Sequence, residues 1–216
     1  MIKAAIFDLD GTVLNNEHAF GEAFQFMLTE LGAKNLPVLP QIRGIGLGAN
    51  WEILLKRYNL ETNKSTEELE QWTVDEYFKH FEDVSLADGF EDFITSLLEN
   101  KIRTALATSS PMVLVKKAIE KFSLNRYFDE IVTADDVSKT KPDPEIFLVA
   151  AEKLKVPRSF CVVFEDAQAG IEAARKAGMK VVGVETEDRE DKLKDVDMKI
   201  VNFTKISLAD LQEKFE

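Results

Sequence analysis

The sequence predicts an α/β fold, with a parallel sheet as its core and an inserted helical cap domain. Two observations support this prediction. Apolar runs of strand length alternate with segments of helical periodicity over most of the chain. The exception is a stretch of about seventy residues after the first run, which shows helical patterns alone and is too long for an ordinary connection.

The expected elements of the core alternate along the chain. Strands are expected over 4–9, 102–107, 131–133, 160–164, 181–184 and 199–203. Helices are expected over 90–98, 112–122, 146–154, 168–177 and 208–215. Consecutive parallel strands need a crossover, and the intervening helices supply it.

The long insertion carries apolar stripes at helical spacing, such as Phe20, Phe24 and Met27. We find no convincing strand pattern between about residues 14 and 84. The predicted domains are therefore a core of residues 1–13 and 85–216 and a cap of residues 14–84, with hinges near 13–17 and 81–88.

Composition limits the classes of function. The chain has 216 residues, a net charge of −12 and a single cysteine, Cys161. The acidic balance disfavours a nucleic-acid partner, and no apolar run reaches the ~20 residues that span a membrane. One cysteine suits a reducing cytoplasm. The oligomeric state, a monomer or a small homo-oligomer, is left open.

The first motif lies at the end of the first strand, where Asp8 and Asp10 are separated by one residue and followed by Gly11. Two carboxylates this close repel each other unless a cation lies between them. Mg²⁺ fits because hard cations prefer oxygen ligands. Asp8, aimed by the metal, would attack phosphorus as the nucleophile. Asp10 would protonate the leaving oxygen and then deprotonate water. A simple turn or helix cap is the alternative interpretation.

The second motif follows the strand at 102–107. Thr108 and Ser109 precede Ser110, a natural helix N-cap, and Pro111, a natural first helical residue. Hydroxyl and backbone N–H groups at a helix N-terminus form an anion site. Thr108 and Ser109 are therefore candidate phosphate-binding residues, although capping alone would also explain them.

Two further segments add a cation and more acids. Lys141 lies in a stretch stiffened by Pro142 and Pro144, and a fixed ammonium group there would bind a phosphoryl group. Glu165 and Asp166 end a buried strand, where acids are costly without a partner. Asp166 would complete the metal site, and Glu165 would be a second ligand or lie just outside it.

Asp8, Thr108 and Asp166 each follow the carboxyl end of a different predicted strand, and such ends line one crevice in an open parallel sheet. These motifs, in this order, resemble those of the haloacid-dehalogenase-like hydrolases. The resemblance implies a Rossmann-like core and an aspartyl-phosphate intermediate. It also implies a Mg²⁺ ion held by Asp8, the backbone carbonyl of Asp10, and Asp166. The helical insertion is similar to the cap of the subgroup containing phosphoglycolate phosphatases and beta-phosphoglucomutases.

The expected function is a Mg²⁺-dependent phosphatase for a small phosphorylated metabolite. A sugar-phosphate mutase and a non-catalytic phospho-ligand binding protein are the alternatives. The mutases of that subgroup have a histidine shortly after the first motif and a basic residue early in the cap. The first position falls on Phe20 and the second near Leu47 here, and His18 should face away from the position of Phe20. Absence of the acid–base group favours hydrolysis.

The glycine-rich segment at 43–48 follows no strand, so a dinucleotide loop is disfavoured. It is either a cap loop that faces the active site, with Arg43 near the substrate, or a solvated turn.

Overall fold

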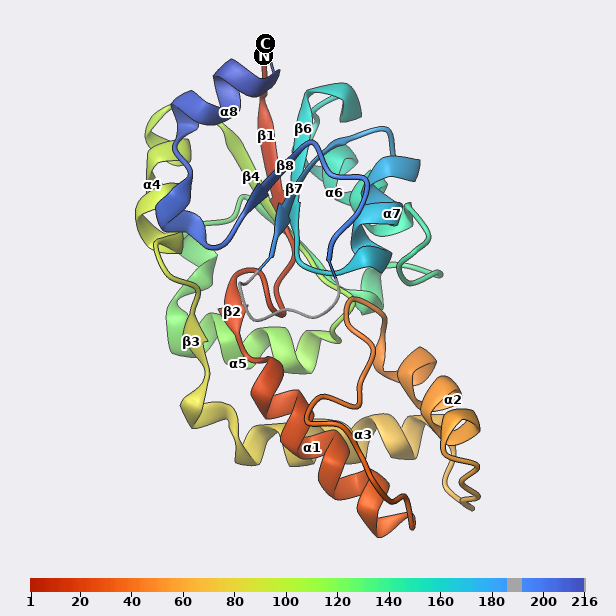
Figure 1. Cartoon of the computed structure of the whole chain (residues 1–216). Helices are drawn as coiled ribbons and strands as arrows, with labels where there is room; N and C mark the ends of the chain where they lie inside the picture. Colours follow the sequence, from red (N-terminus) through yellow and green to blue (C-terminus); the bar gives the residue numbers. More distant parts are fainter. Residues whose placement is uncertain (186–191, 216) are drawn as a thin grey trace.

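A computed structural model describes residues 1–185 and 192–215. Its main sheet has six strands, all parallel, in the order β5-β4-β1-β6-β7-β8 (Figure 1). The strands are β1 (Ala4–Phe7), β4 (Arg103–Ala107), β5 (Glu130–Val132), β6 (Cys161–Glu165), β7 (Lys180–Val184) and β8 (Met198–Ile200). The predicted parallel α/β core is confirmed.

Helices cover both faces of this sheet, as Figure 1 shows. One face carries α4 (Phe90–Glu99), α5 (Met112–Phe122) and α8 (Leu208–Phe215), and the other carries α6 (Glu145–Leu154) and α7 (Gln168–Lys176). Alternate residues of β1 serve the two layers: Ala5 and Phe7 pack on the first side, Ala4 and Ile6 on the second. A strand buried on both faces reads as a continuous apolar run.

Aromatic rings pack together at the centre of the sheet, next to the first motif. Phe7 stacks on Phe164 of β6 with ring centroids 4.6 Å apart, and it meets Phe90 of α4 edge-on at 5.7 Å. Each such buried ring stabilises the fold by about 1.5–3 kcal/mol relative to exposure. This packing fixes the end of β1, and so the starting point of the Asp8 side chain.

Three helices separated from the sheet form the inserted cap: α1 (Glu17–Glu30), α2 (Leu47–Arg57) and α3 (Thr66–Lys79) (Figure 1). Trp51 of α2 is buried against Phe24 of α1 and donates its Nε1–H to Thr73 of α3 at 2.8 Å. The apolar residues of these three helices belong to the same buried cluster that packs on one face of the sheet. The expected helical insertion is confirmed.

A short antiparallel pair was not predicted. β2 (Leu14–Asn15) pairs with β3 (Ser85–Leu86) where the chain passes between sheet and cap helices. The expectation of no strand between about 14 and 84 is thus wrong at β2. Two residues carry no periodic pattern, so the pairing has no local signal. Short 3₁₀ segments complete the elements: η1 (Phe81–Asp83), η2 (Leu124–Arg126), η3 (Ala134–Asp136), η4 (Arg158–Phe160) and η5 (Phe203–Lys205).

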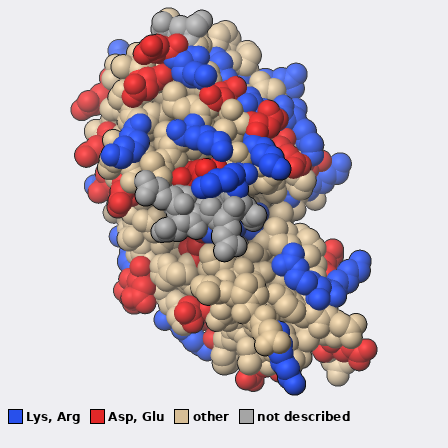
Figure 2. Space-filling view, in the orientation of Figure 1, with Lys and Arg blue, Asp and Glu red and all other residues tan. Residues whose placement is uncertain are grey.

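Acidic and basic side chains are interspersed over the core on the face that Figure 2 shows. Among residues 1–185 and 192–215, no helix combines the length and the apolar character needed to cross a bilayer.

Candidate active site

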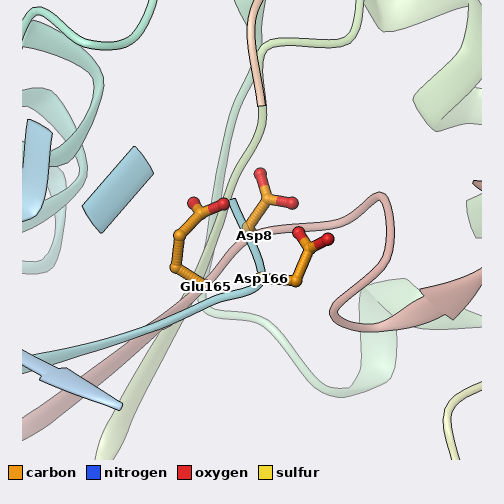
Figure 3. A group of neighbouring side chains, drawn as sticks. All are labelled: Asp8, Glu165 and Asp166. Carbon is orange, nitrogen blue, oxygen red and sulfur yellow. The ribbon is translucent and has the colours of Figure 1, made fainter. Parts of the chain in front are cut away.

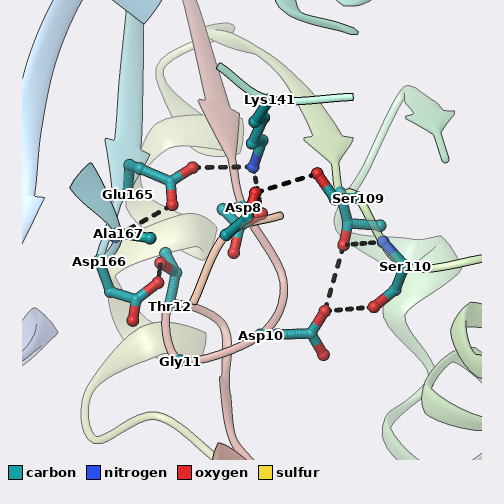
Figure 4. A network of polar contacts seen from close by, with 12 residues as sticks. Asp8, Asp10, Gly11, Thr12, Ser109, Ser110, Lys141, Glu165, Asp166 and Ala167 are labelled. Atoms are coloured by element: carbon teal, nitrogen blue, oxygen red, sulfur yellow. Dashed lines mark hydrogen bonds and ion pairs between the residues drawn. The ribbon is translucent and has the colours of Figure 1, made fainter. Parts of the chain in front are cut away.

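A buried lysine joins two of the predicted acids beneath the pocket. The Nζ of Lys141 lies 2.5 Å from Oδ1 of Asp8 and 2.8 Å from Oε2 of Glu165 (Figure 4). Lys141 is 1% exposed and Glu165 is fully buried, so water does not screen these ion pairs. The contacts orient the Asp8 carboxylate directly after β1.

Three carboxylates gather around this position. One oxygen from each of Asp8, Glu165 and Asp166 lies within 4.8 Å of the others (Figure 3). Such hard oxygen donors are the ligands that Mg²⁺ prefers. The turn at Gly11 makes room for them: it has φ of +80°, and a Cβ there would lie 2.5 Å from Oδ2 of Asp166. The donor set and the space left by glycine both fit a divalent cation.

Electrostatics in this cluster favour a bound cation. Burial, and then the nearby charge of Glu165, raises the pKa of Asp8 well above its usual range. Burial opposes a charge on Lys141, but the carboxylates of Asp8 and Glu165 outweigh it and raise the pKa of the ammonium group. Lys141 therefore stays charged, and the remaining excess of negative charge in the cluster favours either a proton or a metal ion.

The carboxylate of Asp10 is held in place by hydroxyl and amide donors. It accepts a hydrogen bond from Ser110 Oγ at 2.5 Å (Figure 4). It also accepts from Thr108 Oγ1 at 3.3 Å and from Asn16 Nδ2 at 2.6 Å. Asn16 also donates to the phenol oxygen of Tyr77, 3.0 Å away on α3. Sequence reasoning missed Asn16 and Tyr77, because Asn before a helix reads as a cap and Tyr77 is far along the chain.

The segment after β4 differs from expectation in one respect. Helix α5 begins at Met112 with Pro111 as its N-cap, so the prediction of Ser110 as the N-cap was wrong. The hydroxyl of Ser110 is instead turned toward Asp10. Thr108 is fully buried beside Asp10, and Ser109 donates its hydroxyl to the carbonyl of Gly44 in the cap at 3.2 Å.

A pocket lies between core and cap. Asp8, Asp10, Thr108 and Ser109 line its floor, while the cap side includes Arg43. The loop at 43–48 therefore faces the site, as one of the two interpretations of this segment expected. Arg43 forms an ion pair with Glu17 and lies 4.0 Å from Oδ2 of Asp166. Sequence reasoning had not singled out Glu17.

Phe20 and Leu47, which lie at or near the positions where a mutase residue was expected, also line this pocket. Phe20 and Leu47 are buried, each 8% exposed, and both contribute to the pocket wall. His18 is exposed on α1 and is not among the lining residues. Neither Phe20 nor Leu47 can transfer a proton or bind a phosphate group.

Comparison with known proteins agrees with this geometry. Residues 5–184 match the family described as haloacid dehalogenase-like hydrolase. The phosphorylated carbohydrates phosphatase of Thermotoga maritima is 32% identical over 85% of each chain. The fructose-1-phosphate phosphatase of Escherichia coli is 30% identical over 83% of this chain and 94% of its own.

The beta-phosphoglucomutase of Clostridium difficile has a similar structure. It superimposes with a TM-score of 0.88 at 26% identity, over 100% of this chain and 97% of its own. The fold, the cluster of acids at the ends of β1 and β6, and the family match across the core and cap agree. The chain belongs to the haloacid dehalogenase-like hydrolase family.

Proposed function

We propose that this protein is a Mg²⁺-dependent phosphatase that hydrolyses a small phosphorylated metabolite through a phosphoryl group carried on Asp8. The observation that carries the proposal is the arrangement of Asp8. It is buried between Lys141 and two further acids, and it lies at the floor of a pocket that the cap borders. The relatives named as phosphatases support the same reaction class.

The chain supplies groups for both halves of the reaction. In the first half, a carboxylate oxygen of Asp8 attacks phosphorus, the P–O bond of the ester breaks, and Asp10 protonates the departing oxygen. In the second, Asp10 removes a proton from water, which attacks phosphorus and releases inorganic phosphate and Asp8. Thr108 and Ser109 would bind phosphoryl oxygens, and Lys141 would hold Asp8 and stabilise charge.

Asp8, Asp166 and the backbone carbonyl of Asp10 would hold Mg²⁺, with Glu165 just outside as the partner of Lys141. The ion would draw the substrate phosphate toward Asp8 and neutralise charge that develops during transfer. The backbone N–H of Ala167 already donates to Oε1 of Glu165 at 3.1 Å, so both carboxylate oxygens of Glu165 have partners within the protein. These contacts give Glu165 the role of holding Lys141 in place.

We propose that the cap comprises residues 14–84. We also propose that it rotates about the β2–β3 pair, where the chain passes from core to cap and back. Opening would admit substrate and closure would exclude bulk water. We also propose that the enzyme works in the cytoplasm as a monomer or a small homo-oligomer.

Hydrolysis is favoured over the mutase reaction by Phe20 and Leu47, which place apolar groups where a mutase needs an acid–base group and a cation. The test is phosphate release from a panel of phosphorylated metabolites, with and without Mg²⁺. A second assay, incubation with beta-glucose 1-phosphate and catalytic glucose 1,6-bisphosphate, tests for the mutase reaction. Glucose 6-phosphate formed faster than free phosphate would contradict the phosphatase assignment.

A further inference from the structure

The cap side of the pocket carries polar groups that the transfer of a phosphoryl group does not use. Glu17, Gln41 and Arg43, here called the polar wall, line the pocket together with the apolar Phe20 and Phe24. We propose that the polar wall recognises an uncharged, polyhydroxylated leaving group, so that the substrate is the phosphate monoester of a polyol or sugar. This inference rests on the proposed phosphatase function.

The first observation is an amide oxygen without a partner. Gln41 Oε1 is buried and accepts no hydrogen bond from the residues that the structure describes. Gln41 Nε2 donates to the backbone carbonyl of Glu17 at 3.2 Å, which fixes the amide orientation, because a flipped amide would set two oxygens against each other. A buried acceptor left unsatisfied is destabilising, because it has given up its hydrogen bond to water. Because Gln41 also lines the pocket, we take the donor that satisfies this oxygen to be a group of the bound substrate, such as a hydroxyl.

The second observation concerns charge. Arg43 is the one basic residue among the described residues that line the pocket, and it is already paired with Glu17. Asp8 and Asp10 also line the pocket, so a leaving group with a carboxylate or second phosphate would meet several acids. A hydroxyl needs no free cation, since it can accept from the guanidinium group and donate to a carboxylate.

The loop that bears Gln41 and Arg43 is held in place. Asn50 of α2 accepts a hydrogen bond from the N–H of Ile42 at 2.7 Å and donates to the carbonyl of Ile42 at 2.9 Å. Ile42 lies between the two residues, so this double hydrogen bond sets the position of both. A pre-positioned polar wall fits selective recognition better than a solvated turn does.

The apolar side of the pocket completes the match. Phe20 is packed against Tyr77, with ring centroids 4.3 Å apart, and is therefore fixed in position. A sugar or polyol presents C–H groups as well as hydroxyls, and the two phenylalanine rings offer a surface for the former. An inorganic diphosphate has no C–H groups that could pack on that surface.

The experiment compares three substrates on one enzyme preparation: D-sorbitol 6-phosphate, 2-phosphoglycolate and acetyl phosphate. We expect wild-type kcat/KM for sorbitol 6-phosphate to exceed that for phosphoglycolate by at least about tenfold. Gln41→Leu should lower the ratio of sorbitol 6-phosphate to acetyl phosphate activity by about tenfold, because the Oε1 acceptor is gone. The ratio does not depend on the fraction of folded protein.

Gln71→Leu is the matched control, since Gln71 lies exposed on α3 and pairs with Asp75 outside the pocket. It should leave the ratio unchanged. Preference for phosphoglycolate, or an equal ratio in Gln41→Leu and wild type, would overturn this inference while leaving the phosphatase intact. Failure of the wild type to hydrolyse any of the three would overturn the proposed function, and this inference with it.

Discussion

Replacing Lys141 with methionine removes the ammonium group that joins two buried acids. The side chain is fully buried, and it lies 2.5 Å from Asp8 and 2.8 Å from Glu165. Removing one partner of a buried ion pair typically costs about 3–5 kcal/mol, because the charge left behind has neither water nor a counter-ion. At this chain length each kcal/mol shifts the melting temperature by about 2–4 °C. We therefore expect the melting temperature of Lys141→Met to lie about 6–20 °C below that of the wild type.

The assay is urea and thermal unfolding in the presence of a chelator, with Lys139→Met as the control. The side chain of Lys139 is 72% exposed and pairs with Asp143 at 3.7 Å, so its loss should change stability by no more than about 0.5 kcal/mol. Adding Glu165→Gln to Lys141→Met should cost less than the two single effects together. A Lys141→Met variant as stable as the control would refute this account of the cluster.

Further outcomes test other parts of the site. Asp166→Ala should weaken Mg²⁺ binding by at least about tenfold, measured by calorimetry, because it removes an anionic ligand; unchanged affinity would show that Asp166 is not a ligand. Wild-type Mg²⁺ affinity should rise with pH, since burial raises the pKa of Asp8 and the protonated carboxyl must release its proton to bind; a flat profile would count against Asp8 as a ligand. Tyr77→Phe should lower kcat by about 2–10-fold with a smaller change in KM, because the phenol holds Asn16 against Asp10; a change in KM alone would refute that positioning role.

The destabilisation of Lys141→Met should also depend on pH. Without the ammonium group, which lowers the pKa of Asp8, the folded-state pKa of that carboxyl lies still further above its unfolded value. A folded state that binds the extra proton loses stability as pH rises. The destabilisation caused by Lys141→Met should therefore be smaller at about pH 5 than at about pH 8.

The sequence predicted the core of the site because its determinants are local. Asp8 and Asp166 directly follow buried apolar runs, and parallel strands bring their carboxyl ends to one edge. The buried position of Lys141 between Asp8 and Glu165 matches the expectation of a fixed ammonium group among carboxylates.

The cap contribution could not be predicted in the same way. Whether Arg43 meets the pocket depends on how the cap docks, and the close approach of Gly44 to Ala167 fixes that docking: a Cβ at Gly44 would lie 2.5 Å from Cβ of Ala167. Contacts between segments more than a hundred residues apart leave no periodic pattern in the amino-acid sequence. The buried Gln41 is likewise evident only once its neighbours are placed.

The role of Ser110 shows a further limit. Serine before a proline and an apolar helical stripe predicts an N-cap, and local propensity supports nothing else. In the structure the Ser110 hydroxyl donates to the carboxylate of Asp10, and α5 begins at Met112 with Pro111 as its N-cap. A charged acceptor makes a strong hydrogen bond, and only the three-dimensional arrangement brings it within reach.

The most direct test of the central claim is the turnover of Asp8→Asn in phosphate release with saturating Mg²⁺. Asparagine keeps the shape of the side chain and removes the anion that attacks phosphorus. We predict a fall in kcat of at least about a thousandfold, with the thermal unfolding transition still cooperative. Turnover within about tenfold of wild type would show that phosphoryl transfer does not pass through Asp8.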